Sequence, residues 1–127
     1  MEEKISNFTI ENGKSVHWCY KNNKVILSFS DYFEAYLLEN RNEVLILSEI
    51  NEESNKNLTL YKANGDVKYI PEMPKLKKPV LGVYTIIFAK EKKILEVVLS
   101  SETFAPFDTG CKFDVENGIF FDFHPSK

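Results

Sequence analysis

The chain has 127 residues, of which 43% are hydrophobic and 13% aromatic. A chain of this size and composition can bury a hydrophobic core without disulfides or metals, so we expect one domain spanning residues 1–127. Sixteen Lys and Arg against nineteen Asp and Glu give a net charge of -3. This balance argues against a strongly basic nucleic-acid binder.

The first residues are charged and include no apolar stretch of the kind found in secretory signals, so we expect a cytoplasmic protein. The longest apolar run, Val80 to Ala89, has about half the length of a membrane helix, and no membrane segment is predicted. The two cysteines, Cys19 and Cys111, are expected to be free in a reducing compartment, although a disulfide between them is left open.

Apolar and β-branched runs between turn clusters predict strands along the whole chain. The stretch Tyr32 to Asn40 is left open as a short helix, and the proline-rich connection 71–79 is expected to be extended. The predicted strands lie at about 5–10, 15–20, 24–30, 33–39, 43–49, 57–62, 67–71, 80–89, 93–100, 111–115 and 119–123.

Three Asn-Gly pairs mark hairpin turns, because a two-residue type I′ turn needs positive φ at both central residues. The flanking apolar residues alternate, as in half-buried strands. The pairs are spaced by 52 and 53 residues and lie at Asn12-Gly13, Asn64-Gly65 and Asn117-Gly118.

A second kind of hairpin, with nearly continuous apolar runs, lies between these pairs at 36–47 and again at 86–97. Four strands in about 50 residues resemble a β-propeller blade. The resemblance implies an all-β antiparallel meander of ten to eleven strands in blade-like repeats, forming an open, partial propeller. The alternative is a β-barrel or β-sandwich with at most one short helix.

Candidate catalytic and metal residues are few. Asp108-Thr109-Gly110 matches the triplet of aspartic proteases, but it lies late in the chain and is favourable turn chemistry before a strand. His17, Cys19, Cys111 and His124 could form a zinc site only if the two terminal hairpins meet, and close ligand spacing is absent. We therefore predict no catalytic residues, no metal site, no cofactor and no enzymatic activity.

Charge is unevenly distributed. Lysines gather at Lys75, Lys77, Lys78, Lys90, Lys92 and Lys93 without interleaved aromatic residues, which argues against nucleic-acid binding. Acidic residues dominate 31–54, where Arg41 is the only basic residue, and such a surface can steer a basic protein partner. The alternative is that these charges keep strand edges soluble. The predicted partner-binding residues are Asp31, Glu34, Glu39, Glu43, Glu49, Glu52 and Glu53.

Four tyrosines are candidates for exposed interface anchors: Tyr20, Tyr32, Tyr61 and Tyr84. A small, acidic, β-rich chain of this kind is similar in size, charge and expected fold to immunity proteins of bacterial contact-dependent inhibition systems. The resemblance implies a protein-binding module without catalysis that covers a basic nuclease toxin domain. The second hypothesis is a ligand-binding or enzymatic β-barrel with an aromatic-lined apolar pocket, and a homodimer is left open.

Overall fold

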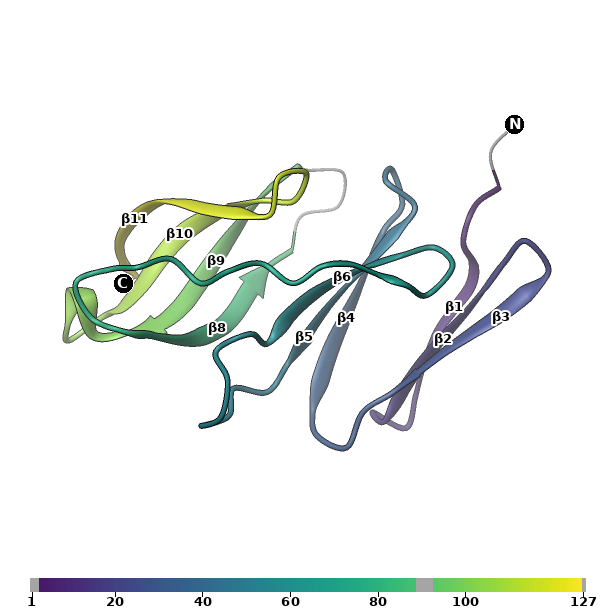
Figure 1. Ribbon diagram of the computed structural model, residues 1–127, viewed down its shortest axis with the longest axis horizontal. Helices are drawn as coiled ribbons and strands as arrows, with labels where there is room; N and C mark the ends of the chain where they lie inside the picture. Colours follow the sequence, from purple (N-terminus) through teal and green to yellow (C-terminus); the bar gives the residue numbers. More distant parts are fainter. Residues whose placement is uncertain (1–2, 89–92, 127) are drawn as a thin grey trace. The chain divides into compact units, whose positions relative to one another are not determined.

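The structure of the protein, a computed structural model, describes residues 3–88 and 93–126. Within these ranges the chain forms eleven strands and one short 3₁₀ helix, η1 (Figure 1). The strands are β1 (Ser6–Glu11), β2 (Ser15–Tyr20), β3 (Asn23–Ser28), β4 (Phe33–Leu38), β5 (Glu43–Ser48), β6 (Leu58–Lys62), β7 (Val67–Tyr69), β8 (Val80–Ile87), β9 (Ile94–Ser101), β10 (Asp108–Asp114) and β11 (Ile119–Ser126), and η1 spans Glu102–Phe104.

The strands form three open antiparallel sheets in which neighbours in sequence are neighbours in space. Their orders are β1-β2-β3, β4-β5-β6-β7 and β11-β10-β9-β8. This confirms the predicted all-β antiparallel meander, and within the described residues no sheet closes into a barrel, the alternative architecture. The arrangement of these sheets as propeller blades stays a prediction.

The chain divides into two compact units. The first unit comprises Met1–Glu49 and Thr59–Tyr69, and the second comprises Ile50–Leu58 and Ile70–Lys127. That the two form one domain stays a prediction. Among the described residues no helix is long and apolar enough to cross a membrane.

The first unit has its core between β1-β2-β3 and the strands β4 and β5. Trp18 on β2 is fully buried, and its indole Nε1 donates a hydrogen bond of 2.6 Å to the carbonyl oxygen of Ala63. A buried indole N–H without such a partner would be costly, so this bond holds the β6–β7 turn to the core. The cluster consists of Val16, Trp18, Phe33, Val44 and Ile46.

The second unit buries one face of the sheet β8-β9-β10-β11. Alternate residues of β9 and β10 point inward, and opposite positions pair Leu95 with Phe113 and Val97 with Cys111. The rings of Phe113 and Phe120 pack at 4.7 Å between centroids. Cys19 and Cys111 are free thiols, so the disulfide that the sequence left open is absent.

The sequence correctly predicted hairpins at the three Asn-Gly pairs, but the three turns do not share one geometry. Asn12 and Gly13 have φ of 52° and 64°, as a type I′ turn requires. At the other two pairs only the glycine has a positive φ. In the first turn Lys14 N donates to Glu11 O and Gly13 is a central residue, whereas Gly65 N donates to Lys62 O and Gly118 N donates to Asp114 O, so in these two turns the glycine closes the turn. The prediction of three type I′ turns is therefore wrong for two of them.

Candidate functional site

Strand β8 exposes every third residue instead of every second. Leu81, Tyr84 and Ile87 are 57%, 64% and 60% exposed, whereas the residues that precede each of them, Val80, Val83 and Ile86, are buried. A regular strand would alternate with a period of two. Three large apolar side chains therefore point to solvent from one strand.

Two irregularities in the pairing of β8 with β9 explain this period. The register shifts between Val80 and Gly82 and again between Val83 and Thr85, so Leu81 and Tyr84 are the extra residues. A bulge adds one residue to a strand and redirects the side chains that follow it. Gly82 has a φ of 149°, which side-chain-bearing residues rarely adopt, so the first irregularity depends on glycine.

The side chain of Asn57 occupies the outer edge of β8. Its Nδ2 donates to Val83 O and its Oδ1 accepts from Val83 N, both at 2.8 Å, and Asn57 is buried. Asn55 Nδ2 donates to Val80 O at 3.2 Å. The two amides satisfy backbone groups that an edge strand would otherwise offer to another strand. Another strand could pair with this part of the edge only by displacing the two amides.

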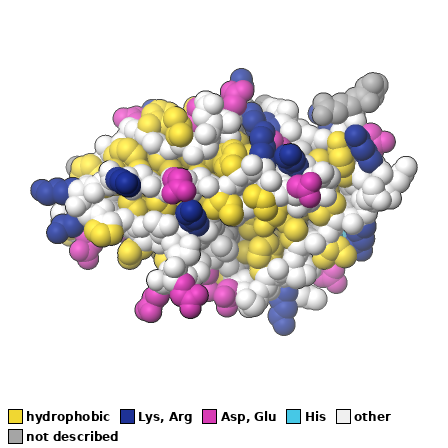
Figure 2. All heavy atoms as spheres, in the orientation of Figure 1, with side chains coloured by type: hydrophobic (Ala, Val, Ile, Leu, Met, Phe, Trp, Pro, Cys, Tyr) yellow, Lys and Arg dark blue, Asp and Glu magenta, His cyan; other side chains and the backbone are white. Residues whose placement is uncertain are grey.

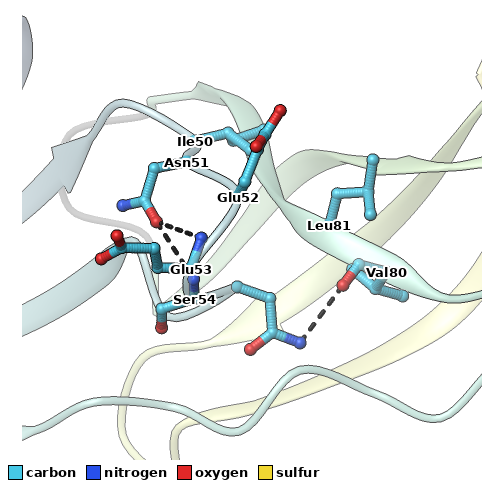
Figure 3. A pocket seen from close by; sticks show the side chains of 8 residues that line it. Ile50, Asn51, Glu52, Glu53, Ser54, Val80 and Leu81 are labelled. Atoms are coloured by element: carbon cyan, nitrogen blue, oxygen red, sulfur yellow. Dashed lines mark hydrogen bonds between the residues drawn. The ribbon is translucent and has the colours of Figure 1, made fainter.

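A tight loop, 50–55, lies beside the start of β8. Asn51 Oδ1 accepts hydrogen bonds from the backbone N of Glu53 and of Ser54, at 2.9 and 3.0 Å (Figure 3). This asparagine cap closes the turn and leaves Glu52 and Glu53 exposed at its tip. The loop and the residues Val80 and Leu81 line an open pocket of about 520 Å³.

We call Leu81, Tyr84, Ile87, Glu52 and Glu53 the β8 surface. It places an exposed tyrosine between two exposed aliphatic residues of one strand, and the loop that carries Glu52 and Glu53 lies across the pocket from Leu81 (Figure 3). Figure 2 shows hydrophobic side chains at the molecular surface with charged side chains among them. Aromatic anchors with aliphatic neighbours and a charged rim are typical of protein–protein interfaces.

The predicted acidic residues are divided between the two units and differ in exposure. Asp31, Glu39 and Glu49 are exposed in the first unit, whereas Glu52 and Glu53 belong to the second. The remaining two are Glu34, which is half-buried and hydrogen-bonded to two tyrosines, and Glu43, which is buried.

Glu43 has a structural role. Its side chain forms ion pairs with Arg41, at 2.8 Å, and with Lys68. Because burying a carboxylate without a partner is costly, these cations compensate for its loss of hydration. Glu43 is thus neutralised inside the first unit and we leave it out of the proposed partner-binding residues.

The catalytic and metal candidates do not come together. The triplet Asp108-Thr109-Gly110 lies in β10, where it pairs with residues 124–126 of β11. Its interpretation as a turn before the strand is therefore wrong. In the part of the chain that the structure describes, no three His, Cys, Asp or Glu side chains are grouped so that they could hold a metal ion. His17 instead contacts Glu11 at 3.1 Å.

The lysine and tyrosine candidates differ in where the structure places them. Lys90 and Lys92 lie outside the described residues. Tyr32 and Tyr84 are exposed as proposed for interface anchors, whereas Tyr20 and Tyr61 pack against the core of the first unit.

Sequence reasoning missed Leu81 and Ile87, because a regular strand would not expose both of them together with Tyr84. The one signal in the sequence was Gly82 inside an apolar run, since a glycine there often marks a bulge.

Comparison with known proteins finds a similarity of fold. No model of a protein family matches the sequence, and no curated protein matches it. A chain of a solved structure, described as the structure of Tne2 in complex with Tni2, is similar with a TM-score of 0.62 and 11% sequence identity. The similarity covers 90% of this chain and 78% of that chain. At this identity it shows a common fold.

Proposed function

We propose that this chain is a protein-binding module without catalysis, and that it acts as an immunity protein by covering a basic toxin domain. The observation that carries the proposal is the β8 surface, in which two bulges expose Leu81, Tyr84 and Ile87 on one strand. Exposing three large apolar residues is unfavourable unless a partner covers them.

Two further observations support this function. The similar structure contains two proteins in complex, Tne2 and Tni2. The carboxylates of Glu52 and Glu53 lie at the exposed tip of the loop beside Leu81, where they can accelerate association with a positively charged partner. A basic toxin domain that binds nucleic acid has a surface of that charge.

The test uses the product of the reading frame next to this gene. It is produced in a bacterial host with and without this chain, and growth and the affinity of the purified pair are measured. We expect growth inhibition that this chain relieves, and an association rate that falls steeply with added salt. A neighbour that is neither toxic nor bound by this chain would contradict the immunity function.

Variants of the β8 surface locate the binding site. Tyr84→Ala should weaken the complex roughly thirtyfold, because exposed tyrosines at interface centres often contribute about 2 kcal/mol. Leu81→Ala should also weaken it, whereas Ile26→Ala, at an equally exposed position on β3, should not. Equal effects of Leu81→Ala and Ile26→Ala would contradict the assignment. So would a dimer of the free chain that Tyr84→Ala dissociates, because the surface would then join two copies.

A further inference from the structure

Two tyrosines enclose a glutamate at the edge of the second sheet. Tyr32 immediately precedes β4, and Glu34 and Tyr36 follow at intervals of two, so the three side chains leave the same side of the backbone. β4 is the edge strand of the sheet β4-β5-β6-β7. Tyr32 is 63% exposed, and Glu34 and Tyr36 are half-buried.

Each phenol binds a different oxygen of the same carboxylate. Tyr32 Oη donates to Glu34 Oε2 at 3.1 Å, and Tyr36 Oη donates to Glu34 Oε1. The hydrogen bond to Glu34 raises the pKa of Tyr32, and burial followed by the bond to Glu34 raises that of Tyr36. Both phenols therefore remain protonated donors at neutral pH. They hold the carboxylate in one orientation, and each of its oxygens keeps acceptor capacity.

Glu34 and Glu43 differ in the partners of their carboxylates. Glu43 is paired with Arg41 and Lys68, but within the described residues the partners of Glu34 are the two phenols. A phenol donates a hydrogen bond to a carboxylate oxygen but does not neutralise the negative charge of the carboxylate. The first unit thus presents a negative charge that is oriented, partly exposed and flanked by aromatic rings.

We propose that Tyr32, Glu34 and Tyr36 receive an arginine side chain from the protein partner. A carboxylate binds guanidinium through two parallel N–H···O bonds, and its planar shape allows the same group to stack on a neighbouring ring. The exposed ring of Tyr32 supplies a face for this cation–π contact. The proposal rests on the protein-binding function and names the chemistry of one contact.

Arginine fits these three residues better than lysine does. The lysine ammonium is a compact, strongly hydrated charge, and it cannot form the two parallel bonds to one carboxylate. A site built from a carboxylate alone would not distinguish the two cations strongly. The adjacent phenol ring is therefore the feature that should favour guanidinium.

The test uses N-acetyl-arginine methylamide as a probe of peptide arginine. The intact chain is prepared with ¹³C-labelled tyrosine rings and titrated by NMR, in parallel with the corresponding lysine and citrulline compounds. We expect weak, saturable shifts at the Tyr32 and Tyr36 rings with the arginine compound, and much smaller shifts with the other two. Equal shifts with lysine, or arginine shifts confined to other tyrosines, would overturn the proposal. Tighter binding of free L-arginine than of the capped compound would also overturn it, because the occupant would then be the amino acid.

Charge-removing variants separate this site from general electrostatics. Glu34→Gln keeps the shape of the side chain and should weaken arginine binding roughly tenfold. Glu49→Gln removes one charge from the exposed residue that follows β5 and should leave binding unchanged. If both variants weaken binding equally, the site is not specific and the proposal fails. Unchanged signals of the tyrosines other than Tyr32 and Tyr36 in each free variant show that the fold is retained.

The outcome of the arginine titration does not depend on the outcome of the test of the proposed function. Arginine can bind at Glu34 even if the neighbouring gene product proves harmless, which would remove only the immunity function. Conversely, if the complex forms through the β8 surface and keeps its affinity in Glu34→Gln, the protein-binding function stands and the arginine site is overturned.

Discussion

The side-chain amide of Asn57 pairs with the backbone of Val83 as a neighbouring strand would. Nδ2 donates to the carbonyl and Oδ1 accepts from the N–H, both at 2.8 Å. The amide comes close because residue 82 is glycine: a Cβ there would lie 2.9 Å from Asn57 Oδ1. One side chain thus closes the edge of β8 while the strand's own side chains remain exposed.

Asn57→Ala should destabilise the protein by about 3 kcal/mol, because it leaves a buried N–H and a buried carbonyl without partners. Urea unfolding measures this loss. The opened edge should also promote association, visible in size-exclusion chromatography. Asn55→Ala removes one longer bond from an exposed residue and should cost less than about 1 kcal/mol. Similar losses for the two variants would contradict the role of Asn57.

Glu43→Gln should cost about 2 kcal/mol of stability, because Arg41 and Lys68 lose their shared anion while remaining partly hydrated. The free energy of unfolding in urea measures the effect. Affinity for the partner should not change, since Glu43 is buried. As a control, Glu49→Gln at the exposed position after β5 should alter stability by no more than about 0.5 kcal/mol. A loss of affinity with unchanged stability would return Glu43 to the binding surface.

Local patterns were sufficient to predict the strands. The apolar run after Tyr32 forms strand β4, and the helix left open for Tyr32 to Asn40 is absent. β10, however, begins at Asp108, three residues before the predicted start, because its pairing with β11 extends to Ser126. Sequence shows where a chain can be extended, but the length of a strand also depends on its partner.

The candidate site was less predictable, because it depends on tertiary contacts. The seven acidic residues were similar in sequence, yet Glu43 is neutralised by Lys68, which is 25 residues away, and Glu34 is bound by tyrosines. The exposure of Leu81 follows from a bulge whose edge is closed by Asn57, in a distant segment. Neither fact is contained in a local pattern of charge or hydrophobicity.

Unfolding of the two compact units should occur in one transition. The boundary between them, at Leu58 and Thr59, falls inside β6, so loss of either unit would disturb a strand that both use. Trp18 is the single tryptophan and is fully buried in the first unit, so its fluorescence reports on that unit, whereas far-UV circular dichroism reports on all the sheets. We expect the two urea curves to coincide. Separate midpoints would show that the units unfold independently.

Cys111 should be chemically inert in the folded protein. Burial, followed by the nearby charge of Glu96, raises its pKa to about 12. A thiol with a raised pKa is less deprotonated, so at pH 8 only roughly one Cys111 in ten thousand would carry the reactive thiolate. Cys19 is only partly buried. We expect iodoacetamide at pH 8 to modify Cys19 alone in the native chain and both thiols in urea, as measured by mass spectrometry. In Cys19→Ser the native protein should remain unmodified, and rapid labelling of that variant would show that Cys111 is accessible.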